Sequence, residues 1–181
     1  MRQPFASLIF TLLLLICAPK IYRVPTGAMS PTIKVGDSIL TDETFYLKNP
    51  VQRFDIVLFK AAEVVNTEES QIDENQRWVM RVVGLGGETV EIKNGKVFIK
   101  KKPLRELFKT EPSDDDFGPL LIPEGEFFIL GDNRPNSADS RFWPDPTLSQ
   151  KAITAKVIKV LPQGEHHANS TGQTRTRALR G

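Results

Sequence analysis

The dipeptide Asn94–Gly95 constrains the fold of this chain most strongly, because it lies between two short runs of alternating residues. Residues 89–93 and 96–100 each alternate apolar and polar side chains with a period of two, which is typical of strands with one buried face. Asn-Gly favours the tight turn that joins two antiparallel strands. The sequence therefore predicts a β-hairpin here.

Further strand signals occur along the whole chain. They lie at residues 38–41, 54–60, 77–85, 127–130 and 153–161. Residues 61–76 and 101–118 are charged and without a clear period, so they are expected to form surface loops. Short strands with few helices in a chain of 181 residues predict a single all-β, antiparallel domain.

An apolar run opens the sequence. Arg2 and Lys20 bracket 17 uncharged residues, which as a helix would be roughly 26 Å long, enough for a thin bilayer. We predict a membrane anchor over residues 4–19, and a cleaved secretory signal or a buried core helix are the alternatives. A core helix would need a polar face, which this run lacks. Pro19 would follow a cleavage site after Ala18 with a rigid ring, which disfavours cleavage.

Composition excludes several classes of function. The net charge of +2 indicates no dedicated nucleic-acid surface. Cys17 is the single cysteine, so neither an internal disulfide nor a cysteine-ligated zinc site is expected, and we predict no metal and no cofactor. His166 and His167 lie in a small, polar, basic tail, residues 163–181, which we expect to be disordered. Such a tail cannot hold an imidazole rigidly, so a Ser-His-Asp triad is excluded.

Four segments carry motifs in a fixed order. They are residues 25–33 (PTGAMSPTI), 53–59 (RFDIVLF), 80–88 (MRVVGLGGE) and 131–141 (GDNRPNSADSR). Together they resemble type I signal peptidases, which are membrane-anchored Ser/Lys endopeptidases. The resemblance runs from about residue 24 to residue 161. It implies a signal-peptidase-like β domain over residues 22–162 on one N-terminal transmembrane helix, placed on the outer face of the plasma membrane.

Both residues of the family's catalytic dyad are replaced. By the resemblance, Ala28 occupies the position of the nucleophilic serine and Met80 that of the lysine base. A methyl group has no oxygen to attack with, and a thioether does not accept a proton at useful pH. Met80 has a length and an aliphatic stem similar to those of lysine, so it can fill the slot without the cost of burying an ammonium group. We therefore predict that the chain is noncatalytic.

Four other residues match supporting positions of the family. Thr26 matches a residue that supplies a hydroxyl to the oxyanion hole in some members. Ser137 resembles the serine that bonds the catalytic lysine, and with Met80 opposite we expect it to bond backbone or water. Asp139 and Arg141 resemble an ion pair that braces the active-site loop.

Three positions depart from the family pattern near these motifs. Phe54 stands in place of a glycine, Gly86 in place of a proline, and Glu88 in place of an aspartate.

The resemblance implies a role in the secretory pathway, where the family removes signal peptides from exported preproteins. We expect this chain to retain a cleft that binds signal-peptide segments by strand addition, which relies on main-chain hydrogen bonds. Two alternatives remain open: a membrane endopeptidase that uses unrecognised catalytic groups, and a structural subunit that pairs with an active paralogue. The expected partners are signal-peptide segments, membrane lipid and such a paralogue, and not nucleic acid.

Overall fold

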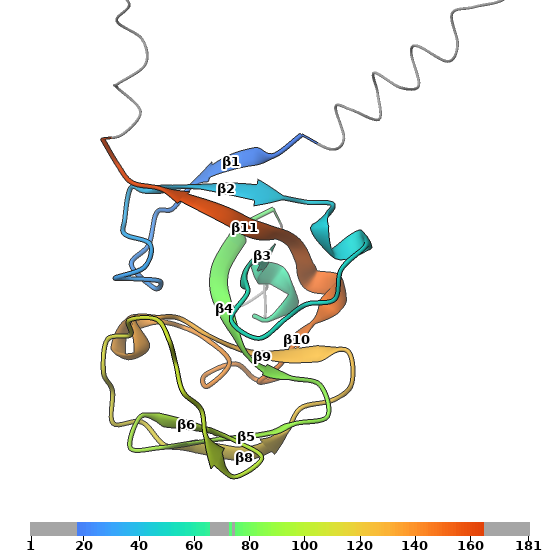
Figure 1. The fold of residues 1–181 in the computed structure, drawn as a ribbon, viewed down its shortest axis with the longest axis vertical. Coiled ribbons are helices and arrows are strands. Elements are labelled where there is room, and N and C mark those ends of the chain that lie inside the picture. The colour runs from blue at the N-terminus through green and yellow to red at the C-terminus, as the bar shows by residue number, and fades with distance from the viewer. Residues whose placement is uncertain (1–17, 66–72, 74, 165–181) are drawn as a thin grey trace, which may run out of the picture.

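The computed structural model describes residues 18–65, 73 and 75–164, which form two antiparallel sheets (Figure 1). The larger sheet has seven strands in the order β1 (Lys20–Arg23), β2 (Ser38–Asp42), β11 (Ile153–Leu161), β3 (Ile56–Lys60), β4 (Arg77–Leu85), β9 (Glu126–Leu130) and β10 (Leu148–Ser149). Every pairing within it is antiparallel. The all-β antiparallel fold expected from the sequence is confirmed.

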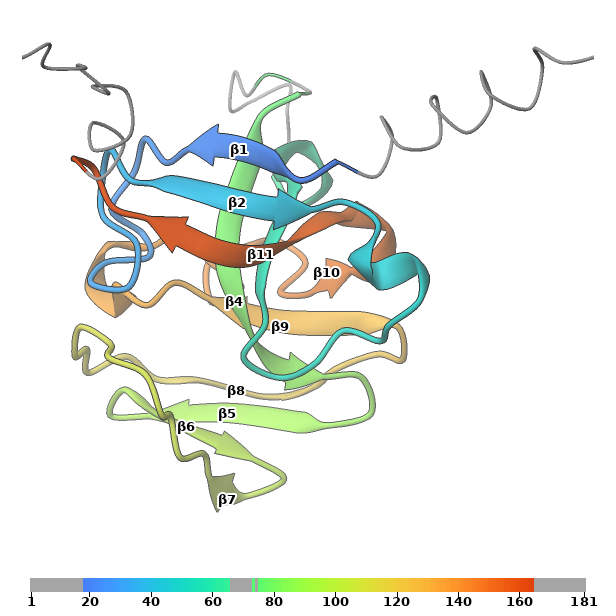
Figure 2. The same ribbon diagram turned by 45° about the horizontal axis from the view of Figure 1, so that its top comes forward.

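The smaller sheet contains the hairpin that the sequence predicts. Its order is β7 (Lys102–Pro103), β6 (Lys96–Ile99), β5 (Thr89–Lys93) and β8 (Phe117–Leu121). Asn94 and Gly95 take φ values of +47° and +71° between β5 and β6, the left-handed conformation that a two-residue hairpin turn requires. The long strand β4 runs from the larger sheet toward the smaller one (Figure 2).

Helical structure in the described residues is limited to four 3₁₀ turns, which are Phe45–Leu47, Ala61–Glu63, Arg134–Asn136 and Gln150–Ala152. Across residues 18–65, 73 and 75–164, no helix is long and apolar enough to span a bilayer. The predicted anchor at residues 4–19 lies outside the described residues except for its last two, and the predicted disordered tail lies outside them from residue 165. Both stay predictions.

Four strands were missed in the sequence, and one of them, β7 at Lys102–Pro103, has only two residues and lies within the predicted loop 101–118. β1 begins at Lys20, directly after the apolar run, and its four residues are too few to show a period. β8 contains Gly118 and Pro119, which ordinarily argue against a strand. β8 lies at the edge of its sheet, where a missing backbone N–H costs no ladder hydrogen bond, so proline is tolerated there. β10 has only two residues and gives no periodic signal.

Two apolar clusters form the core, and β4 contributes to both. Met80 and Val82 belong to the larger cluster, together with residues such as Met29 and Phe59. Val83 belongs to the smaller cluster, which packs between the smaller sheet and β9. Because consecutive residues of a strand point to opposite faces, this single strand holds the two parts of the domain together.

Phe54 has a left-handed backbone with φ of +74°. Its ring packs edge-on against Phe108, with centroids 5.3 Å apart. Its N–H donates to the Val82 carbonyl over 2.7 Å, and its own carbonyl accepts from Arg81 over 3.1 Å. The backbone is therefore held in a conformation that an L side chain rarely adopts.

We predict that Phe54→Gly is more stable than Phe54→Ala by about 1 kcal/mol, because both variants lose the ring contact but only alanine keeps the left-handed backbone strain. Urea unfolding of the two variants measures the difference. As a control, the same pair of substitutions at the extended, half-buried position Phe98 of β6 should rank in the opposite order. Equal stability of Phe54→Gly and Phe54→Ala would show that the strain is not stored at this position.

Candidate active-site cleft

Ala28 and Met80 line one cavity of about 520 Å³. Its walls come from the stretch 22–28, from β2 and β3, from residues 75–80 and from the loop 136–138. The lining residues are Tyr22, Arg23, Val24, Pro25, Thr26, Gly27, Ala28, Ile39, Leu58, Asn75, Gln76, Arg77, Trp78, Val79, Met80, Asn136 and Ala138. The two positions that resemble the catalytic dyad, 52 residues apart in sequence, thus meet in one mostly apolar cleft.

The loop that presents Ala28 is held by its backbone. The Ser30 N–H donates to the Gly27 carbonyl over 3.0 Å. Asn133 makes two hydrogen bonds to the same turn. Its backbone N–H donates to the Ala28 carbonyl and its side-chain Nδ2 donates to the Gly27 carbonyl, each over 3.0 Å. Residues 24–37 contain no strand or helix, as the prolines and glycine of this stretch predict.

Two hydrogen-bond donors at this turn remain available. Thr26 lines the cavity and is exposed. Among the described residues, neither the Thr26 hydroxyl nor the Ala28 N–H has a hydrogen-bond partner. Two unpaired donors beside a cleft can donate hydrogen bonds to a carbonyl oxygen of a bound chain.

Met80 lies opposite, on β4, where it pairs with Val57 of β3. Its side chain is 3% exposed and packs in the larger core cluster. The slot is therefore apolar, and methionine fills it without an unpaired charge.

The cleft lacks a group that could activate a nucleophile. Its described lining residues include two hydroxyls, of Tyr22 and Thr26, and two guanidinium groups, of Arg23 and Arg77. They include no lysine, histidine, aspartate or glutamate. Guanidinium groups stay protonated in proteins, so none of these lining side chains can take a proton from a hydroxyl near neutral pH.

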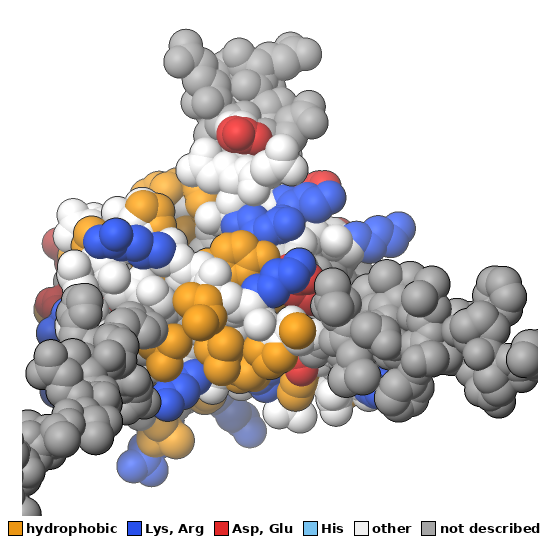
Figure 3. All heavy atoms as spheres, turned by 90° about the horizontal axis from the view of Figure 1, so that it is seen from above, with side chains coloured by type: hydrophobic (Ala, Val, Ile, Leu, Met, Phe, Trp, Pro, Cys, Tyr) orange, Lys and Arg blue, Asp and Glu red, His pale blue; other side chains and the backbone are white. Residues whose placement is uncertain are grey.

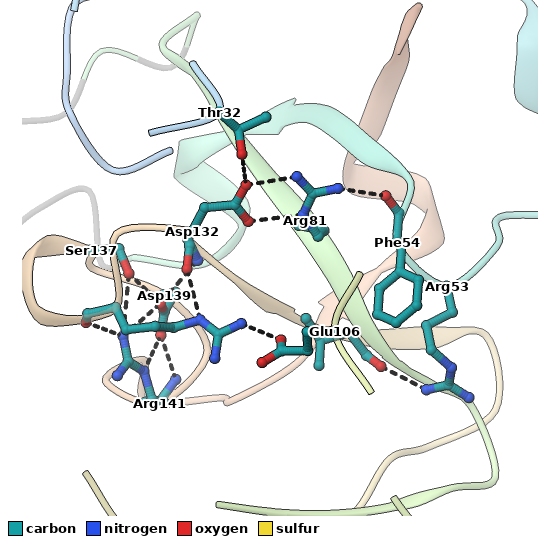
Figure 4. Close-up of polar contacts among 12 residues, drawn as sticks. Thr32, Arg53, Phe54, Arg81, Glu106, Asp132, Ser137, Asp139 and Arg141 are labelled. Atoms are coloured by element: carbon teal, nitrogen blue, oxygen red, sulfur yellow. Dashed lines mark hydrogen bonds and ion pairs between the residues drawn. The ribbon is translucent and has the colours of Figure 1, made fainter. Parts of the chain in front are cut away.

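Ser137, Asp139 and Arg141 meet behind the cleft (Figure 4). Arg141 Nε contacts Asp139 Oδ1 over 2.8 Å, and the side chains are 3% and 0% exposed. The Ser137 hydroxyl donates to Asp139 Oδ2 and accepts from Arg141. Ser137 was expected to bond backbone or water, and this expectation is wrong, because a buried carboxylate two residues away is the stronger acceptor.

Arg141 has two further partners. It forms an ion pair with Asp115 and donates to the carbonyl of Arg134 over 2.6 Å. Asp115 belongs to residues 101–118, which the sequence predicts to be a surface loop. Glu106 of the same segment pairs with Arg134. The buried side chains of Arg134 and Arg141 thus hold this charged segment against the loop 131–141 by ion pairs.

A second buried network was not singled out in the sequence. Arg81 donates two hydrogen bonds to the Asp132 carboxylate, over 2.8 and 2.6 Å. The Thr32 hydroxyl donates to the same carboxylate over 2.5 Å. The Arg81 guanidinium also lies 3.8 Å from the centroid of the Phe108 ring. Thr32, Arg81 and Asp132 each lie in one of the four motif segments. Their contact with one another, however, is seen only in the folded structure (Figure 4).

Glu88 forms a bidentate pair with Arg53 over 2.7 and 2.8 Å. Burial acts to raise the pKa of the Glu88 carboxyl, but the hydrogen bonds from Arg53 and from the Leu85 N–H outweigh it and hold this pKa below its usual range. The pair therefore fixes the turn after β4.

Two strand edges border the cleft without another strand from the described part of the chain beside them. β1 is the last strand of its sheet and pairs only with β2. Residues 77–80 of β4 pair only with β3, because β9 joins β4 from Arg81 onward. Both edges carry cavity-lining residues. An extended chain lying between them could bond to free backbone groups on either side.

Comparison with known proteins identifies the family. The family described as "Signal peptidase, peptidase S26" matches residues 2–161. The chain belongs to this family, and the resemblance seen in its four motifs is confirmed.

Individual relatives agree with this assignment. A protein named signal peptidase I from Leptolyngbya laminosa is 38% identical over 120 residues, which cover 66% of this chain and 58% of that one. The probable signal peptidase I-1 of Synechocystis sp. is 34% identical over 137 residues, 76% of this chain and 69% of that one. The matched stretch therefore spans between about half and two thirds of the relatives' length. A crystal structure of a signal peptidase I from Enterococcus faecalis is 30% identical, covering 60% of this chain and 97% of that one, with a TM-score of 0.46.

Removing Arg141 should destabilise the domain strongly. We expect Arg141→Ala to lower the free energy of unfolding by about 3–5 kcal/mol, because the buried Asp139 carboxylate loses its main counter-charge. The exposed Arg105, which forms no ion pair with any described residue, serves as the matched control, and Arg105→Ala should change stability by less than about 0.5 kcal/mol. Similar urea midpoints for the two variants would refute the bracing role of Arg141.

Restoring only the lysine should also destabilise the protein. We expect Met80→Lys to cost about 2–5 kcal/mol at pH 7, because the core disfavours an ammonium group and lowers the amine's pKa. The unfolded chain then holds more protons than the folded chain, so this loss should shrink as the pH rises from 7 toward 10. Met80→Leu should cost less than about 1.5 kcal/mol, with no such pH dependence. Thermal melting across this pH range tests both statements.

Proposed function

We propose that this member of the signal peptidase family is noncatalytic and binds signal-peptide segments of exported preproteins in the cleft between β1 and β4. The observation that carries the proposal is the composition of the cleft. Ala28 and Met80 face one cavity whose described lining offers no activatable nucleophile and no base. Removal of one member of such a catalytic unit already abolishes most of the acceleration.

Binding does not depend on the missing dyad. The unpaired edges of β1 and of residues 77–80 can pair with an extended peptide, and apolar side chains such as Ile39 and Leu58 form the floor on which its side chains would lie. The Thr26 hydroxyl and the Ala28 N–H, which have no partner among the described residues, can donate hydrogen bonds to one of the peptide's carbonyl oxygens. These features support retention of a ligand without its cleavage.

Membrane attachment completes the proposal. The apolar run at residues 4–19 would anchor the chain in the plasma membrane by a single span, with the β domain on the exocytoplasmic face. β1 starts directly after this run, so the cleft would lie near the bilayer, where signal peptides are presented. An active paralogue bound to the same substrates would be a natural partner of such a chain.

The central test is a cleavage assay with a purified preprotein and the detergent-solubilised full-length chain. We expect no mature product from the wild-type chain or from Ala28→Ser, and measurable product from the Ala28→Ser/Met80→Lys variant. Assays at alkaline pH, where the introduced lysine destabilises the fold least, with melting curves alongside, separate lost activity from lost folding. Cleavage by the wild-type chain would refute the noncatalytic proposal and favour an endopeptidase with other catalytic groups.

Binding needs its own measurement. Fluorescence anisotropy with a labelled synthetic signal peptide should show saturable binding to the wild-type chain. Ala138→Trp, which places a large ring at the cavity wall, should weaken binding at least about tenfold, a change of roughly 1.4 kcal/mol. Leu121→Trp on the smaller sheet, at an exposed position, should leave it unchanged. Equal binding by both variants would place the peptide elsewhere.

A further inference from the structure

The charged residues that line the described part of the cleft are all cationic. They are Arg23 and Arg77, and neither side chain forms an ion pair or a hydrogen bond with any described residue. The face of the domain that carries β1 is seen from above in Figure 3, where lysine and arginine side chains lie among apolar ones. An acidic group on a bound chain would complement this charge.

The side chain of Arg77 lies on the same face of β4 as the floor of the cleft. Arg77 pairs with Lys60 of β3, and Val79 pairs with Leu58. Because alternate residues of a strand share a face, Arg77 and Val79 project to the same side. Val79 and Leu58 line the cavity, so the half-buried Arg77 stands at one end of its apolar floor.

Arg23 is directed to the other side of its strand. It follows Tyr22 on β1, and the Tyr22 ring packs against the larger core cluster. Consecutive strand residues point to opposite faces, and Arg23 is exposed. Arg77 is therefore the cation that a chain lying on the floor would meet.

Glu43 lies close enough to Arg77 to interact with its charge, but other groups already bind it. Its carboxylate pairs with Lys20 over 2.7 Å and accepts from the Tyr22 hydroxyl over 3.0 Å. The hydrogen bond from Lys20 is the main cause that holds the pKa of Glu43 below its usual range. The two cations Lys20 and Arg77 therefore face one carboxylate, and a positive charge is left without a counter-charge among these three.

A strand added at residues 77–80 would bring its side chains into register with this face. These residues pair only with β3, because β9 joins β4 from Arg81 onward. Residues directly opposite each other in paired strands project on the same side. A peptide residue opposite Val79 would thus pack on the apolar floor, and the residue two positions along would lie opposite Arg77.

We infer that the cleft prefers segments with an aspartate or glutamate two positions from the residue that packs against Val79, and that Arg77 pairs with this acid. The inference rests on the proposed peptide binding and adds a charge preference to it. Because Arg77 is half-buried, an ion pair there is screened less than one on an open surface. Bound segments are then selected by charge as well as by apolar side chains.

The test is an aspartate scan with the full-length chain in nonionic detergent. Each labelled synthetic signal peptide carries one aspartate, moved one position at a time along the segment, and its partner peptide carries asparagine at the same position. Fluorescence anisotropy measures both affinities for the wild-type chain, for Arg77→Gln and for Arg105→Gln. Arg105 is exposed and does not line the cavity, so it is the matched control. Melting curves verify that each variant is folded.

We expect aspartate to strengthen binding about threefold to fivefold over asparagine at one position. This preference should fall at high salt, vanish in Arg77→Gln and persist in Arg105→Gln. Arg77→Glu should reverse it, so that lysine at the same position binds better than aspartate. A preference that persists in folded Arg77→Gln would refute the assignment to Arg77.

Two further outcomes separate this inference from the proposed function. Saturable binding of the asparagine peptides with no gain from aspartate at any position would refute the charge preference and leave peptide binding intact. Absence of saturable binding by every peptide would refute the proposed function, and this inference with it.

The spacing is tested by a second scan. A single leucine is moved along the asparagine peptide, and Val79→Ala, which opens room on the floor, should strengthen the binding of leucine at one position only. The aspartate that responds to Arg77 should lie two residues from that position. Any other spacing would contradict the strand register.

Discussion

The buried pair of Arg81 and Asp132 is the interaction on which the arrangement of the cleft depends. Arg81 stands next to Met80 on β4, and Asp132 starts the loop that supports the cleft, while Thr32 brings in the turn after Ala28. The two charged side chains are 8% and 1% exposed. Burial of two charges is favourable only with near-complete hydrogen bonding, and here both oxygens of Asp132 and three nitrogens of Arg81 have partners. Three motif segments are thereby held in one geometry.

Ala28 and Met80, at the positions that resemble the catalytic dyad, are compatible with this scaffold. Ala28 lies in a turn whose backbone carbonyls accept hydrogen bonds from Asn133. Methionine fills a core slot that is 3% exposed with no charge to compensate. The supporting ion pair of Asp139 and Arg141 is complete without a lysine nearby, since Ser137 turns its hydroxyl to Asp139.

Phe54 and Glu88, which also differ from the motif pattern that the sequence resembles, both contact neighbouring side chains. Phe54 keeps a backbone conformation suited to glycine, and its ring packs on Phe108, which also lies under the Arg81 guanidinium. Glu88 reaches Arg53 with both carboxylate oxygens. Through Phe108, the segment after β7 thus packs against residues that support the cleft. The stretch 101–118, which the sequence predicts to be a surface loop, therefore stabilises the cleft.

The sequence by itself determined the all-β class, the β5–β6 hairpin, the full extent of β4 and β11, and the family, because these follow from local periodicity, turn chemistry and motif order. It did not find β1 or β8, because the first is too short to show a period and the second contains Gly118 and Pro119. Only the tertiary structure decided that Ala28 and Met80 share one cavity, that Asp132 pairs with Arg81, and that Arg141 reaches Asp115. Such contacts join residues tens of positions apart, and their partners are selected by packing and by the need to satisfy buried charges, which no local pattern records.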